Sequence, residues 1–470
     1  MFSVRRRGTA RLAAATVVSG LVAAGAIAVA GPAMADEGLQ GTGGATATLG
    51  DLKIFDKVAI EGREKPISAG LFEMQVTPGG TLQTYCIDLY TGAKKGQEYK
   101  EVGWDQSSLH NNKDAGKIRW ILQNSYPQVD KLDELAKKVG ATNLTKETAA
   151  AATQAAIWHF SDDVEAMPVD AEAKKLTQWL EDKAENLAEP KASLSLSPSS
   201  LAGKAGERLG PVTVSTNAAK ATVSLAPGAP AGVKIVDKDG KVVTDVANGA
   251  QVFFDVPAGT ADGSAELTVQ ADTTVPIGRA FVSTKVKSQT LILAGTSTST
   301  VNAKASATWA KKGAVPAVSA VKNCAKGGLD VTASNEGDED FTFELKGLKY
   351  TIAAGASKTV TVPLAEDQAY DFTITGPNGF EKTFKGVFDC KTATPAPEPS
   401  ETPSTEPSPT TPAGTTGGTG TGTGTGTTSG DLAETGSSNA TPMIAGIAVV
   451  LVVLGGGAVF FLRKKKAAGQ

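Results

Sequence analysis

The residue best suited to covalent chemistry in this sequence is Cys86. The chain has three cysteines and two histidines, and two of the cysteines, Cys324 and Cys390, bracket one segment. In an exported chain such a bracketing pair is expected to form a disulfide. Cys86 is then left over, and an odd cysteine in an exported protein is a candidate free thiol. A thiol attacks carbonyl carbons, so the acyl group that faces Cys86 decides its chemistry.

Gln154 is the candidate acyl group. Cys86 lies in a β-like run over residues 84–90, where Asp88 shares its face of the strand. Gln154 lies in an alanine-rich run that predicts a helix, on the same face as Ile157 and Trp158. An amide on an apolar helix face needs a partner, because burying an unpaired polar group costs free energy.

Two other interpretations remain open. Cys86 and His159 form the residue pair of a cysteine-nucleophile enzyme, such as a transglutaminase or a peptidase. Against that, His159 is five positions after Gln154, which turns it about 140° away from Gln154 on a helix. The third interpretation is a non-covalent adhesin or wall stalk that binds its target through β-domains.

Residues 36–190 contain the elements that must position these groups. The apolar pattern predicts strands over residues 45–76 and 82–89, followed by helices over 114–123 and 130–139. Thr145 is expected to cap a helix that runs through Phe160, and Asp170 to cap another that ends before Pro190. An α+β domain with a small β-barrel or sheet and a helical subdomain is therefore expected.

The next two segments are predicted to be all-β. Residues 191–312 contain short alternating runs, among them 279–285 and 289–293, which favour a β-sandwich. Residues 317–391 form a smaller immunoglobulin-like unit that the disulfide would staple. Lys204 and Asn302 leave open whether the first sandwich contains an isopeptide crosslink.

The two ends of the chain are basic, although the net charge is −3. Residues 1–35 contain an arginine cluster, an apolar run and Ala-Met-Ala, which is typical of a cleaved secretory signal. Residues 392–431 are rich in Pro, Thr and Gly and predict an extended, disordered linker. Residues 442–462 are apolar and long enough to span a bilayer, and the basic tail 463–470 would stay cytoplasmic.

The C-terminal arrangement resembles the cell-wall sorting signal of Gram-positive surface proteins. The motif that precedes the apolar segment, similar to the LAxTG variant of LPxTG, consists of Leu432, Ala433, Glu434, Thr435 and Gly436. The resemblance implies that a sortase cleaves after Thr435 and joins it to peptidoglycan, so that the membrane segment anchors only the precursor. Ala433 stands where proline is commoner, which leaves the sortase class open. The arginine cluster near the N-terminus likewise leaves open whether export follows the general secretory or the twin-arginine route.

Two internal segments resemble the thioester domain of Gram-positive surface adhesins, over about residues 36–190. The family pattern is an aromatic–cysteine pair on a strand and a TQxA run on a helix, which Tyr85–Cys86 and residues 153–156 match. The resemblance implies a Cys86–Gln154 thioester and covalent attachment to amine groups on an unknown target, without enzymatic turnover. Tyr85, Asp88, Trp158 and His159 are candidates to shield or orient the bond.

The composition makes other functions improbable. Two histidines and cysteines without CxxC spacing argue against a structural zinc site, so no metal is expected. The sequence has no Walker A loop and no strand-to-helix GxGxxG, and no cofactor is expected. The body of the chain is acidic without a basic block, which argues against nucleic-acid binding.

Overall fold

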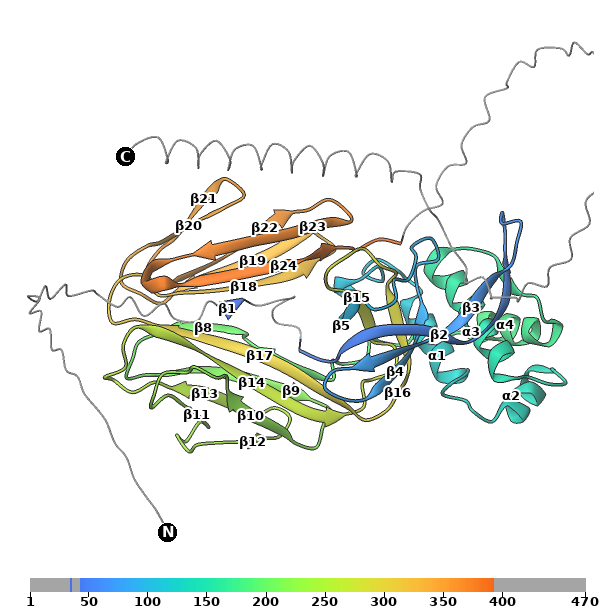
Figure 1. Ribbon diagram of the computed structural model, residues 1–470, viewed down its shortest axis with the longest axis horizontal. Helices are drawn as coiled ribbons and strands as arrows, with labels where there is room; N and C mark the ends of the chain where they lie inside the picture. The colour runs from blue at the N-terminus through green and yellow to red at the C-terminus, as the bar shows by residue number, and fades with distance from the viewer. Residues whose placement is uncertain (1–33, 36–42, 393–470) are drawn as a thin grey trace, which may run out of the picture.

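The computed structural model describes residues 34–35 and 43–392, which form three bodies (Figure 1). A mixed unit lies at one end, and two β-units lie side by side at the other. The predicted linker, sorting motif, apolar segment and basic tail lie outside the described residues, as does the signal peptide except for residues 34–35. No helix within the described ranges is long and apolar enough to cross a membrane.

The mixed unit is built on a seven-stranded sheet with the order β3-β4-β16-β15-β5-β2-β6. β2 also pairs with β3, so six of the strands close into a barrel, as the sequence led us to expect. The strands are β2 (Thr46–Ile60), β3 (Ile67–Val76), β4 (Thr81–Cys86), β5 (Glu98–Val102), β6 (Ala166–Pro168), β15 (Ala280–Ser283) and β16 (Leu291–Thr296).

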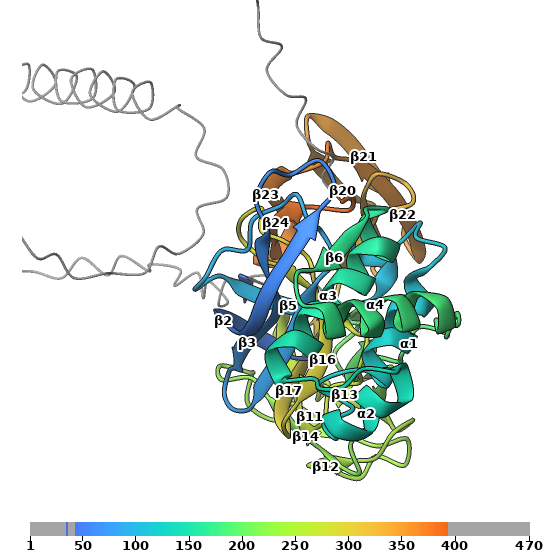
Figure 2. The same ribbon diagram turned by 90° about the vertical axis from the view of Figure 1, so that its right-hand side faces the viewer.

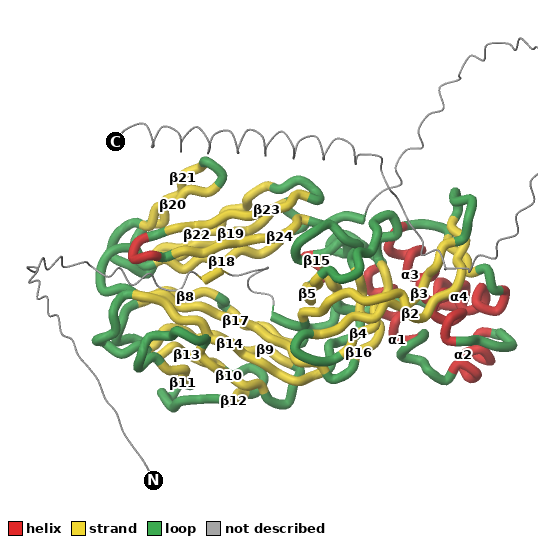
Figure 3. Tube along the Cα trace, in the orientation of Figure 1, coloured by secondary structure: helices red, strands yellow, loops and turns green. Residues whose placement is uncertain are grey.

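Four helices pack at one end of this barrel, away from the β-units (Figures 2 and 3). They are α1 (Ala115–Asn124), α2 (Leu132–Val139), α3 (Lys146–Asp162) and α4 (Ala171–Lys183), with the short 3-10 turn η1 (Trp104–Gln106) before them. Both predicted caps are present: Thr145 accepts a hydrogen bond from Thr148 N–H, and Asp170 from Glu172 N–H and Ala173 N–H. The alanines of α3 are fully buried, and their small side chains let the helix approach the sheet closely.

The predicted boundary between the first two domains is corrected by β15 and β16. Both were expected as strands of the sandwich, but β15 pairs with β5 and β16 pairs with β4 of the barrel. The barrel therefore takes strands from two distant parts of the chain, and the sandwich lies between them in sequence. Residues 191–312 are not one separate domain, because local alternation predicts a strand and not the sheet that it joins.

The sandwich has a five-stranded sheet with the order β12-β10-β14-β17-β8 and a four-stranded sheet with the order β11-β13-β9-β7. Buried side chains of both sheets belong to one hydrophobic cluster. The strands are β7 (Leu194–Ser197), β8 (Ser200–Gly203), β9 (Arg208–Thr216), β10 (Ala221–Leu225), β11 (Lys234–Val236), β12 (Asp245–Val246), β13 (Gln251–Asp255), β14 (Gly263–Thr273) and β17 (Ser299–Trp309).

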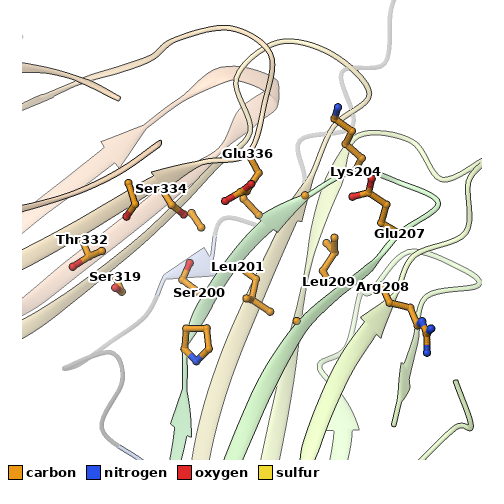
Figure 4. Close-up of a pocket in the computed structure, with 16 residues that line it drawn as sticks. Ser200, Leu201, Lys204, Glu207, Arg208, Leu209, Ser319, Thr332, Ser334 and Glu336 are labelled. Atoms are coloured by element: carbon orange, nitrogen blue, oxygen red, sulfur yellow. The ribbon is translucent and has the colours of Figure 1, made fainter. Parts of the chain in front are cut away.

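Lys204 and Asn302 lie apart within this sandwich. Lys204 lines a polar cleft of about 680 Å³ between β8–β9 and the C-terminal unit, where serine and threonine side chains gather (Figure 4). Lys204 follows Gly203, which pairs with Trp309, whereas Asn302 lies seven residues earlier on the same strand. That separation is about 23 Å along a strand, so the two side chains do not meet.

The C-terminal unit contains two three-stranded sheets, β18-β19-β22 and β1-β24-β23, and the hairpin β20-β21. The predicted Cys324–Cys390 disulfide is confirmed, with 5.4 Å between the two Cα atoms. The elements are β1 (Met34–Ala35), β18 (Pro316–Asn323), β19 (Gly328–Asn335), β20 (Phe341–Leu345), β21 (Leu348–Ile352), β22 (Ala356–Pro363), β23 (Gln368–Thr375), the 3-10 turn η2 (Pro377–Gly379) and β24 (Glu381–Phe388).

A buried ion pair between β5 and the start of β15 also holds the segment that leads into the sandwich. Arg279 Nε donates to Glu101 Oε1 at 3.0 Å, and both side chains are almost fully buried. The same Glu101 carboxylate accepts hydrogen bonds from Ser193 N–H and from Ala45 N–H. Because both charges are buried, removing either partner would leave the other charge uncompensated at this junction.

Candidate functional site

Cys86 is the last residue of β4 and is buried, with 4% of its surface exposed. It pairs with Leu291 of β16, and the next residue, Ile87, donates its N–H to Thr290 O at 3.1 Å. Backbone groups of successive strand residues point to opposite edges, so the N–H and C=O of Cys86 face the β3 side. β3 pairs with β4 only as far as Thr84, which leaves these two groups without a strand partner.

Gln154 supplies that missing partner. Its Oε1 accepts the Cys86 N–H at 2.9 Å, and its Nε2 donates to Cys86 O at 2.9 Å. The amide of Gln154 therefore acts as a short piece of strand at the open edge of β4. The buried amide on the apolar face of α3 therefore has the hydrogen-bond partners that it needs, which are the main-chain groups of Cys86.

The thiol of Cys86 faces a different amide, that of Gln289. The Sγ atom lies 2.7 Å from Gln289 Oε1, and Gln289 Nε2 donates a short hydrogen bond to the main-chain O of Asp88. Gln289 is 6% exposed and stands two residues before β16. The structure thus brings the predicted pair Cys86 and Gln154 together, but the Gln154 amide contacts the main chain of Cys86 and not its thiol. The group at the thiol is Gln289, which the sequence analysis missed.

The loop that holds Gln289 is fastened by buried hydrogen bonds. Tyr99 is fully buried, and its Oη lies 2.7 Å from Ser288 Oγ and 3.0 Å from Gln289 O. Ser288 Oγ also accepts the N–H of Lys94, and Gln289 N–H bonds to Gly92 O. The acyl carbon of Gln289 is therefore presented by a fixed main chain and not by a mobile loop.

The sequence contained one sign that the strand after Gln289 belongs to the barrel and not to the sandwich. Residues 291–294 are all apolar and all buried, whereas the sandwich strands alternate between buried and exposed positions. An unbroken apolar run indicates a strand that is covered on both faces, as in a sheet packed against helices. Gln289 immediately precedes that run.

Burial sets the protonation of the site. It raises the pKa of the Cys86 thiol well above its usual range, and the nearby carboxylates of Asp162 and Asp88 raise it further. The pKa of Asp162 is itself raised to about 6 by burial. Cys86 is therefore a neutral thiol near pH 7, which suits a thiol hydrogen that lies against the Gln289 carbonyl oxygen.

The four residues predicted to shield or orient the bond have different positions. Tyr85 faces the helical core, and its Oη donates to Tyr126 O at 2.7 Å. Asp88 is buried beside the site, and its main-chain O holds the Gln289 amide. Trp158 belongs to the same apolar cluster as Cys86, and its indole N–H has no hydrogen-bond partner among the described residues. Both Asp88 and Trp158 thus remain candidates to orient or shield the bond.

His159 lies on the outer side of α3. A third of its side chain is exposed, its ring packs edge-on against Phe160, and its Nδ1 lies 3.8 Å from Glu165. This placement, which the helix geometry predicted, does not favour a Cys86–His159 dyad. We expect His159→Ala to leave the reaction of the protein with amines unchanged, measured as the rate of methylamine incorporation. A loss of that reaction in folded protein would instead support the dyad.

The thioester domain family matches residues 83–188 of this chain. Residues 314–387 match the C-terminal domain of bacterial phospholipase C. No curated protein matches the chain significantly. Thioester domains of surface adhesins act by covalent binding and not as enzymes, so the family match bears out the prediction that this chain is not an enzyme.

Three solved structures show distant similarity. The Bacillus anthracis TIE protein is 16% identical, with 74% of this chain and 63% of that chain covered and a TM-score of 0.27. The chain thus spans less than two thirds of that protein. The thioester domain of the Enterococcus faecium TIE86 protein is 19% identical over 58% of this chain and 99% of that chain, with a TM-score of 0.28.

The N-terminal thioester domain of a Clostridium perfringens surface protein is 17% identical over 30% of this chain and 87% of that chain, with a TM-score of 0.20. The family match covers only part of the site. Residues 83–188, which hold both Cys86 and Gln154 and end before Gln289, are similar to the thioester domain family.

Proposed function

We propose that this protein attaches covalently to amine groups through an internal thioester between Cys86 and Gln289. The observation that carries the proposal is the 2.7 Å separation between Cys86 Sγ and Gln289 Oε1. This contact places the thiol against the side-chain amide whose carbonyl carbon it would attack.

Formation of the bond balances without a co-reactant. Cys86 Sγ bonds to the side-chain carbonyl carbon of Gln289, the bond from that carbon to Nε2 breaks, and the thiol proton leaves with the nitrogen as ammonia. The hydrogen bond from Nε2 to Asp88 O fixes which side of the amide meets the sulfur. Gln154 supports the reaction by holding the main chain of Cys86.

The thioester then serves as a single-use acyl donor. A neutral amine on the target attacks the Gln289 carbonyl carbon, Cys86 leaves as a thiol, and an amide joins Gln289 to the target. Burial slows loss of the bond to water, because it excludes solvent and disfavours the departing thiolate.

The ends of the chain support display at the cell surface. The signal at residues 1–35 would direct export, and a sortase would join Thr435 to peptidoglycan after a transient membrane stage. The Pro-rich part of the linker, at about 3.1 Å per residue, would carry the folded units outward. We expect the sandwich and the C-terminal unit to be immunoglobulin-like spacers between that linker and the thioester.

Mass spectrometry of the mature secreted protein tests the thioester. Reduced protein should be lighter than its sequence by one ammonia, and treatment with methylamine should convert it to an adduct that maps to Gln289. The Cys86 thiol should become titratable in step with the adduct, because one thiol is released for each amine bound. An adduct on Gln154 would contradict the assignment, and protein of full mass with an unreactive Gln289 would contradict the thioester.

A further inference from the structure

The peptide group between Asp88 and Leu89 connects α3 to the amide of Gln289. Its carbonyl oxygen accepts the short hydrogen bond from Gln289 Nε2, and its N–H donates to Asp162 Oδ1 at 2.8 Å. This peptide is trans, so its C=O and N–H point in opposite directions. The carboxylate of Asp162 and the amide of Gln289 therefore lie at the two ends of one peptide group.

Asp162 is the last residue of α3, the helix that also carries Gln154. Ser161 Oγ lies 2.6 Å from Asp162 Oδ2, so both oxygens of this partly buried carboxylate have a hydrogen-bond partner. The helix thus holds the segment after β4 at two points, with Gln154 at Cys86 and Asp162 at Leu89. Of these two contacts, only the second brings a carboxylate to the site.

The position of Asp162 is unfavourable for a carboxylate. The C-terminal end of a helix carries partial negative charge, which opposes a negative side chain there. Burial raises the pKa of Asp162 to about 6, although the hydrogen bonds from Ser161 and Leu89 oppose that shift. The ionised form therefore lowers the stability of the folded protein at neutral pH, which indicates a role other than holding the fold.

We propose that Asp162 is a positioning residue that acts through the 88–89 peptide on the nitrogen of Gln289, a role that rests on the proposed Cys86–Gln289 thioester. When Cys86 Sγ bonds to the Gln289 carbonyl carbon, the thiol proton moves to Nε2, and ammonia leaves as the C–N bond breaks. The nitrogen is positively charged between these two events. The Asp162 carboxylate polarises the peptide and so strengthens the hydrogen bond that this nitrogen donates to Asp88 O.

The same peptide would hold the amine of the target. The incoming nitrogen bonds to the Gln289 carbonyl carbon where Nε2 was bonded before, and Cys86 is now the leaving group. That nitrogen is again positively charged until it gives a proton to the departing sulfur. Asp88 O accepts a hydrogen bond from it during that time, so Asp162 should speed amine capture as well as thioester formation.

Asp162→Asn tests this role, because asparagine has the same shape and its Oδ1 can still accept the Leu89 N–H. At pH 8, methylamine capture by the full-length secreted protein should be roughly tenfold slower than without the substitution, since charge-assisted hydrogen bonds are about twice as strong as neutral ones. Intact mass against time gives the rate. Asp163→Asn is the matched control and should react normally, because Asp163 is the exposed next residue and asparagine tolerates its left-handed backbone.

The pH dependence separates the charge from the shape of the side chain. With a pKa of about 6, Asp162 is neutral at about pH 5, so the two proteins should react at nearly equal rates there and differ fully above about pH 7. The protonation of methylamine cancels in the ratio of the rates. The titratable groups that interact with Asp162 across the site are Asp88 and Cys86. At this end of α3, His159 faces Glu165, and Lys117 of α1 lies over the ring of Phe160.

Stability should change in the direction opposite to reactivity. Because burial disfavours ionised Asp162, the Asp162→Asn protein should unfold at a higher urea concentration at pH 8. The gain should disappear below about pH 4, where the carboxyl group is protonated in both the folded and the unfolded chain. A carboxylate that served only to hold the loop would give a less stable variant with an unchanged rate ratio at every pH.

Slower capture by folded Asp162→Asn protein, with a rate ratio that grows through about pH 6, supports the proposal. Equal rates at pH 8, or a ratio that does not change with pH, overturn it. If the variant does not fold, the unsubstituted protein decides: its rate per neutral amine must rise through the same pH range, and a flat profile overturns the proposal. Unsubstituted protein of full mass would instead contradict the thioester itself, so the two failures are distinguishable.

Discussion

Replacing Gln289 by alanine should abolish both the ammonia deficit and the capture of amines, and leave the fold nearly as stable as before. The loss should be complete, because the substitution removes the acyl carbon that the thiol requires. The fold should tolerate it, because the loop remains held by main-chain hydrogen bonds and by the contact of Tyr99 with Ser288. Intact mass before and after methylamine, together with a urea unfolding curve, measures both effects.

Matched variants sharpen that expectation. Cys86→Ala should have the same full mass and the same inertness toward methylamine. Gln289→Glu should also fail, since a carboxylate is a much poorer acyl donor than an amide. Gln128 is the control glutamine, because its Nε2 also bonds to the main chain of β16 at Ala294 O but lies away from the thiol. Gln128→Ala should capture methylamine normally, and a Gln289→Ala protein that still loses ammonia would contradict our assignment.

The sequence singled out Cys86 as a free cysteine because the evidence for it is local. Cys86 is the odd cysteine beside an aromatic residue on a strand, and the confirmed Cys324–Cys390 disulfide leaves it as the one free thiol among the described residues. The caps at Thr145 and Asp170 were predicted for the same reason, since a cap depends on residues three positions apart or fewer. These features require no knowledge of the distant chain.

The amide that faces the thiol was not predictable in this way. Gln289 lies 203 residues from Cys86, and the two meet only because β16 leaves the sandwich region and pairs with β4. Gln154 was also a reasonable candidate from the sequence, because it is an amide on an apolar helix face. A sequence pattern shows that such an amide needs a partner, but it does not show whether that partner is a thiol or a main chain.

Substitutions of the two glutamines should therefore have different effects, and a substitution of Gln154 is the second decisive test. We expect Gln154→Met to lower the free energy of unfolding while the folded molecules keep the thioester. Methionine has a similar volume and no hydrogen-bonding amide, so the Cys86 N–H and C=O would be left unsatisfied in a fully buried place. At about 1–3 kcal/mol for each of the two unsatisfied groups, the loss should be roughly 2–6 kcal/mol, measured by urea unfolding.

The outcome of that test distinguishes an acyl donor from a structural support. If Gln154 only completes the edge of β4, then Gln154→Met protein at low temperature, where it remains folded, should still be one ammonia lighter than its sequence. It should also still form a methylamine adduct at Gln289. Gln289→Ala should show the reverse, with normal stability and no adduct. Fully folded Gln154→Met protein that keeps the full mass of its sequence and stays inert to methylamine would instead make Gln154 the acyl donor to Cys86, because the thiol would then have lost its only acyl carbon.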